Sequence, residues 1–195
     1  MSSILSISLF IQLLLLFGVQ DAGATPPSHN LIHETCRKCA RNDPNLSYDF
    51  CVTSLQAAPD SRCANLTQLG VISLKLTRQN LTATKKYIRL LLKNKTSHQY
   101  DDPYIRSCLK DCFRLYSDAI LSLKEAIADY KSTNYADANI KVSSVLDAST
   151  TCEDGFKEKQ GVSSPLTKRN GDTFHLSALA LSIINMHAPP PIRIH

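Results

Sequence analysis

The chain has 195 residues, 43% of them hydrophobic, and a formal net charge of +5 at pH 7. This length suits one domain with one hydrophobic core. The Lys and Arg residues are spread along the sequence, so the charge indicates solubility or retention near an acidic polysaccharide, and not nucleic-acid binding.

The N-terminal segment has the pattern of a secretory signal peptide. It is almost wholly apolar from Ile4 to Val19 and then reaches Ala22-Gly23-Ala24. An apolar run followed by a small-x-small site predicts cleavage after Ala24. The run is shorter than the roughly 20 residues that span a bilayer, which disfavours a membrane anchor. We therefore expect a signal peptide over 1–24, a secreted extracellular domain over 25–188, and no membrane association after cleavage.

The cysteine content and the glycosylation sequons fit a secreted protein. Seven cysteines in an oxidising compartment predict disulfides, and an odd number leaves at least one thiol free or paired with another chain. A monomer is the expectation, with a disulfide-linked dimer as the alternative. Four N-x-Ser/Thr sequons are glycosylation candidates, at Asn45, Asn65, Asn80 and Asn94.

The first predicted unit is a helical hairpin. Residues 29–40 and 46–57 are compatible with short helices, and the residues between them, Arg41-Asn42-Asp43-Pro44-Asn45, are typical of a turn. One cysteine lies in each arm, Cys36 and Cys51. Two such short helices are marginal alone, and a bridge across their turn would add order.

Four longer helices follow, with apolar residues at spacings of three and four. We expect them over about 65–93, 102–131, 135–156 and 172–187, with Asp102 as a cap, Pro103 in a first turn, and a loop over 161–171. The short link Ser132-Thr133-Asn134 forces its two helices to be antiparallel neighbours. The Pro-rich residues 189–195 form a tail. The predicted fold is all-α, an up-down four-helix bundle preceded by the hairpin.

The cysteines could be interpreted as a redox pair or as a zinc site, and the sequence supports both interpretations only weakly. Cys36-Arg37-Lys38-Cys39 is a C-x-x-C pair, but no βαβ pattern surrounds it. A zinc site would need four thiols that oxidise readily in this compartment. Its ligands would come from Cys36, Cys39, Cys108, Cys112, His29 and His33. We expect no metal and no cofactor, and the two histidines on a solvated helix face.

Catalytic motifs are missing from the sequence. It contains no G-x-S-x-G, no H-E-x-x-H and no Gly-rich phosphate loop. Two pairs of adjacent carboxylates, Asp101-Asp102 and Glu153-Asp154, are interpreted as helix capping and solvated charge, because consecutive helix positions point in different directions. An enzyme is not expected.

Several segments, taken in order, resemble the plant invertase/pectin methylesterase inhibitor family. The opening hairpin segments, the third cysteine with its Leu-Tyr-x-Asp-Ala continuation, and three later segments carry the resemblance: Glu34-Thr35-Cys36, 45–51, 111–119, 125–127, 135–139 and 151–156. Residues 69–73 and 152–159 look most like the plane-tree-pollen-allergen type of invertase inhibitor. The resemblance implies the bridges Cys36–Cys51 and Cys112–Cys152. It leaves the pairing of Cys39, Cys63 and Cys108 open.

The resemblance also implies a function. It is that of a secreted inhibitor that docks tightly, one to one, over the active site of a cell-wall or vacuolar invertase or of a pectin methylesterase in the apoplast. In some invertase inhibitors a Pro-Lys-Phe element between the second and third bundle helices is associated with docking; here the place reads Thr133-Asn134-Tyr135. Further contact candidates on exposed bundle faces are Arg114, Asp118, Lys124 and Asn139. The alternative is a non-inhibitory, allergen-like pollen or seed protein that keeps the scaffold.

Overall fold

The computed structural model describes residues 27–93 and 102–187. The predicted signal peptide, the sequon at Asn94 and the tail over 189–195 lie outside the described residues. Within them every regular element is a helix, which confirms the predicted fold class. The elements are α2 (Pro27–Asn42), α3 (Tyr48–Gln56), a short 3₁₀ helix η1 (Pro59–Cys63), α4 (Leu66–Lys93), α5 (Pro103–Lys131), α6 (Tyr135–Lys157) and α7 (Thr167–Asn185).

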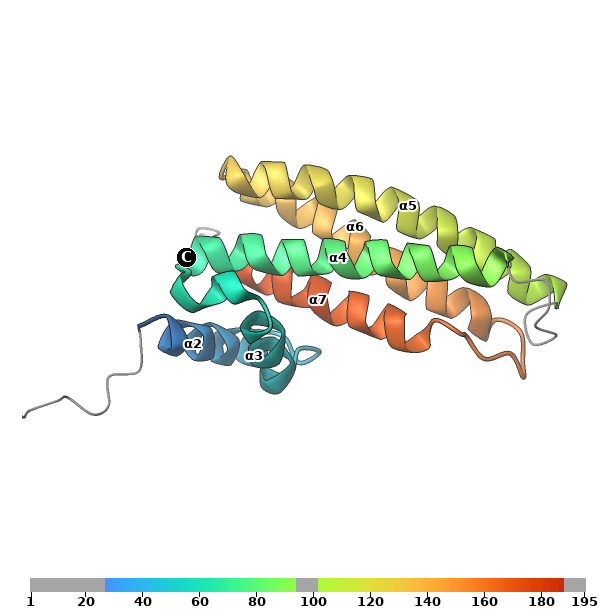
Figure 1. Cartoon of the computed structure of the whole chain (residues 1–195), viewed down its shortest axis with the longest axis horizontal. Helices are drawn as coiled ribbons and strands as arrows, with labels where there is room; N and C mark the ends of the chain where they lie inside the picture. The colour runs from blue at the N-terminus through green and yellow to red at the C-terminus, as the bar shows by residue number, and fades with distance from the viewer. Residues whose placement is uncertain (1–26, 94–101, 188–195) are drawn as a thin grey trace, which may run out of the picture.

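The four long helices α4 to α7 form the bundle. Figure 1 shows α4 lying between α5 and α7, with α6 closing the bundle behind them. The predicted stripe of α5 is buried from Leu109 to Tyr130, and the stripe of α6 is buried from Ala138 to Phe156. Among the described residues, no helix combines the length and the apolar character needed to cross a membrane.

The hairpin of α2 and α3, with η1, packs on one end of the bundle and has a hydrophobic cluster of its own (Figure 1). Ile32, Leu46 and Leu55 form its centre with the Cys36–Cys51 disulfide, whose Cα atoms are 5.6 Å apart. The bundle contributes Leu69 and Ile72 from α4 and Leu179 and Ile183 from α7. The hairpin thus docks where α4 begins and α7 ends.

The helices α3, α4 and α5 begin at residues whose side chains satisfy free backbone N–H groups. The carboxylate of Asp102 accepts from the Tyr104 N–H at 2.7 Å, and Ser47 Oγ accepts from the Phe50 N–H at 3.1 Å. Asn65 and Gln68 cap α4 reciprocally, each side chain accepting from the other's backbone N–H. Such caps stabilise a helix end by about 1 kcal/mol each.

Three details of the predicted elements were wrong. The helix α7 begins at Thr167 and not at Asp172, because Leu166, Asn170 and Thr173 are buried against the bundle, so Gly171 lies inside the helix. The helix α2 extends into the first part of the predicted turn and ends at Asn42, whereas Asp43, Pro44 and Asn45 lie outside it. His33 is not on a solvated face: it is half-buried, with Nδ1 2.6 Å from the Tyr48 hydroxyl of α3.

Candidate functional site

A disulfide joins the neighbouring bundle helices α5 and α6. Cys112 and Cys152 have Cα atoms 5.0 Å apart and are both buried, so the two helices are fixed in register. This pairing and Cys36–Cys51 are the two that the family resemblance implies. A link between residues 40 positions apart stabilises a fold by several kcal/mol. The α5–α6 face is therefore a rigid surface.

A shallow groove of about 250 Å³ runs between α5 and α6 on this face. Its floor is made of small and apolar side chains, and it carries two carboxylates, Asp118 from α5 and Asp147 from α6. Among the described residues, no Lys or Arg lines it. The remaining lining residues are Leu115, Ala119, Ser122, Ser144, Ala148 and Thr151. A groove with a fixed backbone and small side chains can accept a protruding side chain of another protein with little loss of conformational entropy.

The contact residues predicted on the bundle helices divide into three groups. Asp118 is exposed and lines the groove. Arg114 and Lys124 are exposed on α5 but do not line it, and Arg114 lies 3.3 Å from Asp111 in a surface ion pair. Asn139, predicted as exposed, is half-buried, because its Nδ2 donates to Asn185 Oδ1 at 2.7 Å and so ties α6 to α7.

Less of the predicted docking turn is exposed than the sequence indicated. Thr133 is exposed and has a φ of 63°, and Asn134 is exposed beside it. The ring of Tyr135 lies against His187, with centroids 4.8 Å apart and planes 12° apart, and it meets Tyr130 edge-on at 5.3 Å. Tyr135 is therefore packed against its own bundle, and only Thr133 and Asn134 project.

His187, at the other end of this aromatic cluster, is also fixed by a hydrogen bond. The Nε2 atom of His187 is 2.9 Å from the Tyr130 hydroxyl, and burial lowers the pKa of the imidazole. Burial also raises the pKa of the Tyr130 phenol, so both groups stay neutral near neutral pH. A neutral, hydrogen-bonded cluster of three rings closes this end of the bundle.

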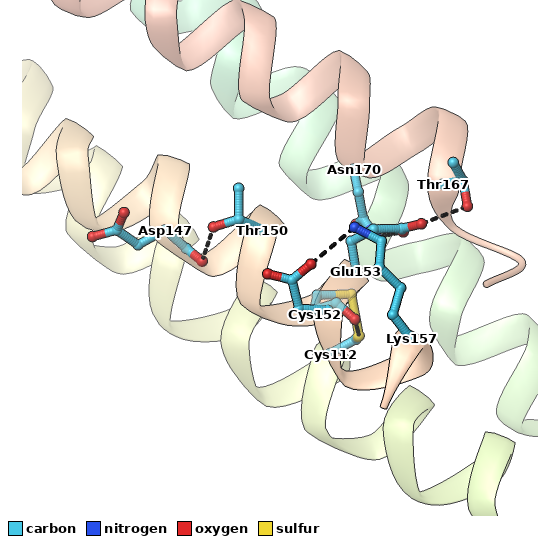
Figure 2. Close-up of polar contacts among 9 residues, drawn as sticks. Cys112, Asp147, Thr150, Cys152, Glu153, Lys157, Thr167 and Asn170 are labelled. Atoms are coloured by element: carbon cyan, nitrogen blue, oxygen red, sulfur yellow. Dashed lines mark hydrogen bonds and ion pairs between the residues drawn. A yellow bond between two sulfur atoms is a disulfide. The ribbon is translucent and has the colours of Figure 1, made fainter. Parts of the chain in front are cut away.

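On the opposite side of α6, Glu153 binds the first turn of α7. Figure 2 shows its carboxylate reaching across to Thr167 and Asn170, next to the Cys112–Cys152 disulfide. Both donors are 2.7 Å from it, and Asn170 in turn accepts from the Tyr116 hydroxyl at 2.7 Å. The interpretation of Glu153 as solvated charge was therefore wrong. The sequence offered no signal for this network, because Asn170 fell within the predicted loop. Asp154, in contrast, is exposed and pairs with Lys157.

The cysteines outside the two bridges are free thiols in the structure. Cys39 and Cys108 are buried and Cys63 is exposed, so Cys36-Arg37-Lys38-Cys39 is not a dithiol pair. Burial raises the pKa of the Cys39 thiol to about 12. In the described part of the chain, no group of three or more His, Cys, Asp or Glu side chains is arranged to hold a metal ion.

The comparisons with known proteins agree with one another. Residues 30–183 match the family model described as plant invertase/pectin methylesterase inhibitor. The chain is 48% identical to a protein of Platanus orientalis named "Putative invertase inhibitor", over 82% of this chain and 91% of that one. It is 38% identical to "Pectinesterase inhibitor 12" of Arabidopsis thaliana, over 82% and 88%.

A solved structure of similar fold is a mutant form of a pectin methylesterase inhibitor from Arabidopsis. It superposes with a TM-score of 0.66 at 28% identity, over 78% of this chain and 96% of that chain. The members of this family are inhibitors and not enzymes, which agrees with the lack of catalytic motifs in the sequence. A helical bundle with a bridged hairpin and a family model that covers most of the chain lead to one conclusion: this protein belongs to the plant invertase/pectin methylesterase inhibitor family.

Proposed function

We propose that this protein inhibits a plant cell-wall carbohydrate-active enzyme by docking one to one over its active site, and that it does so through the α5–α6 groove. The proposal is supported by the rigidity of that face, which is fixed by the Cys112–Cys152 disulfide, and by the groove itself. One relative, 29% identical over 122 residues, is named "Cell wall / vacuolar inhibitor of fructosidase 2", which supports placing the target in the wall or the vacuole.

Of the two target classes, pectin methylesterase is favoured by one observation, the packing of Tyr135. The resemblance placed an aromatic docking residue at this position, but its ring is stacked on His187 and half-buried. Inserting that ring into a partner would first require breaking the contacts with Tyr130 and His187. The family resemblance implies that pectin methylesterase inhibitors bind mainly through exposed faces of the bundle helices. Docking through the α5–α6 groove needs no such rearrangement, since the groove is preformed.

The groove's charge bears on how a target is attracted. The overall positive charge suggested steering toward acidic catalytic groups, but the groove holds Asp118 and Asp147 and no base. Its own field is therefore negative, and it favours a partner surface that carries Lys or Arg around the cleft.

The test is a paired inhibition titration of the mature protein against a purified plant pectin methylesterase and a plant cell-wall invertase at mildly acidic pH. We expect inhibition of the methylesterase, with a one-to-one stoichiometry by calorimetry. The variant D118K/D147K should weaken inhibition at least tenfold, and Asp60→Lys, an exposed carboxylate on η1, should leave it unchanged.

The outcomes separate the alternatives. Inhibition of invertase alone, abolished by Tyr135→Ala, would assign docking to the turn and contradict the groove proposal. If a helical, disulfide-bonded sample inhibits neither enzyme across several isoforms, the protein is the non-inhibitory scaffold instead.

A further inference from the structure

The positive charge of this protein is concentrated on one edge of the bundle. Between residues 61 and 100 the sequence has eight Lys or Arg residues and no Asp or Glu. The helix α4 alone carries six bases and no acid. The interpretation of the basic residues as spread along the chain was therefore wrong for this segment, although the missing acids were visible in the sequence.

The helix gathers its bases into a stripe. With 3.6 residues per turn, the six side chains fall within an arc of about 100° and extend over roughly 27 Å of helix axis. Five are exposed and Lys85 is half-buried. We call this set the α4 stripe: Lys75, Arg78, Lys85, Lys86, Arg89 and Lys93. No other charge interrupts it on α4.

In the described part of the chain, Asp60 lines the same pocket as Lys75, at one end of the stripe, but the stripe's bases are not paired with carboxylates. Among the described residues, none of its six bases forms an ion pair, whereas seven ion pairs occur elsewhere in the protein. The adjoining edge of α5 adds Arg106 and Lys110. These residues precede Phe113 by seven and three positions, which places them on the same face of α5 as that ring. The acidic residue Asp118 lies instead in the groove toward α6.

Two of the stripe's side chains are held in place at the seam between α4 and α5. Lys85 Nζ lies 5.1 Å and the Arg89 guanidinium carbon 5.7 Å from the centroid of the Phe113 ring. The ring attracts both cations and restricts their motion. Preorganised charges lose less conformational entropy when they bind an anion.

We propose that the α4 stripe binds a linear polyuronate, that is, the de-esterified form of pectin, with one carboxylate per sugar. An extended row of unpaired bases matches an extended row of carboxylates better than it matches a single small anion. The choice of a uronate polymer over other polyanions rests on the proposed function, which places the protein in the plant wall. The stripe is on α4 and the groove is between α5 and α6, so both surfaces can be occupied at once (Figure 1).

The experiment measures binding of the mature protein to polygalacturonate by affinity electrophoresis or calorimetry, with no enzyme present. We expect binding at low ionic strength that weakens steeply as NaCl is added, because the contacts are between exposed charges. Fully methyl-esterified pectin, which lacks the carboxylates, should not bind.

A charge-matched pair of variants locates the site. R78Q/K86Q/R89Q/K93Q should lose about tenfold or more in affinity for polygalacturonate. The control R37Q/K131Q/K157Q/K168Q removes the same charge from exposed positions on α2, α5, α6 and α7 and should stay within about twofold of wild type. Circular dichroism checks that both variants remain helical.

Equal losses in the two variants would overturn the site, since net charge alone would then explain binding. Equal binding of methyl-esterified pectin, or of single-stranded DNA of the same charge density, would overturn the assignment to a uronate polymer. These results do not depend on enzyme inhibition. The stripe variant should inhibit the target enzyme like wild type if the proposed function holds, so failure of one proposal is distinguishable from failure of the other.

Discussion

The backbone of Gly70 in α4 lies directly against the hydroxyl of Tyr130 in α5. A methyl group at Gly70 would stand 1.9 Å from the phenol oxygen and 2.3 Å from the carbon that bears it. Tyr130 is fully buried and also contacts Tyr135 and His187, so its ring has no free space to move into. The close approach of α4 and α5 at this end therefore requires glycine.

This contact reverses the usual effect of replacing a glycine inside a helix. Gly70→Ala should lower the free energy of unfolding by about 1 to 3 kcal/mol, because the new methyl group overpacks the core. Gly171→Ala is the matched control: it lies within α7, nothing is within 4 Å of its added methyl group, and it should raise stability by about 0.5 to 1 kcal/mol. Urea denaturation measures both. Stabilisation by Gly70→Ala would contradict the packing described.

The three free cysteines should differ sharply in reactivity. Burial raises the pKa of Cys39 to about 12 and also raises that of Cys108, so at pH 8 both are almost wholly protonated, whereas Cys63 is exposed. Iodoacetamide should alkylate Cys63 in the folded protein and leave the other two unmodified until denaturant is added. Peptide mass spectrometry measures the order; rapid labelling of Cys39 in the native protein would show that its burial is wrong.

The sequons should differ in the fraction of protein that carries a glycan at each. Asn80 is half-buried, and its Oδ1 accepts a hydrogen bond from Thr173 Oγ1 of α7 at 2.6 Å, so a glycan there would separate α4 from α7. Asn45 and Asn65 are exposed and can carry one. Protein secreted from a plant host should show glycopeptides at these two positions and an unmodified Asn80. Full occupancy of Asn80 in folded protein would contradict the α4–α7 contact.

Alkaline pH should destabilise the fold through its buried tyrosines. Burial raises the pKa of Tyr116 to about 12 from about 10. The neutral phenol is the form that the folded state favours, so its contribution is complete below pH 10 and is lost as pH rises toward 12. A shift of this size corresponds to about 2 to 3 kcal/mol. The melting temperature should fall between about pH 10 and 12, and less steeply in Tyr116→Phe. Equal slopes would show that Tyr116 does not carry the effect.

The sequence predicted the fold well because the information was local. Spacings of three and four identified the buried stripes of α5 and α6, and Asp102 marked the start of α5 through its capping chemistry. The start of α7 was missed because Thr167 to Gly171 contains polar residues and a glycine. Among them Asn170 is buried, and its hydrogen-bond partners are Tyr116 and Glu153, which are distant in sequence.

The candidate site was less predictable, for a related reason. Asp118 was identified, but the groove also needs Asp147 and the small side chains that α6 brings alongside α5. Nothing in the local sequence indicates that Tyr135 packs on His187, which lies 52 positions later. Features that depend on contacts between two helices can be recognised only when the positions of both helices are known.

The hairpin's separate hydrophobic cluster has a consequence for cooperativity. The hairpin's cluster includes Leu69 and Ile72 of α4 and Leu179 and Ile183 of α7, but it is distinct from the cluster that α5 and α6 form with the rest of the bundle. The hairpin, whose own interior is held by the Cys36–Cys51 bridge, can therefore open without exposing that second cluster. Native-state amide exchange should therefore resolve two classes of protected amides, those of α2 and α3 exchanging through a smaller, sub-global opening and those of α5 and α6 only through complete unfolding. One end of the molecule can loosen while the surface between α5 and α6 keeps its shape.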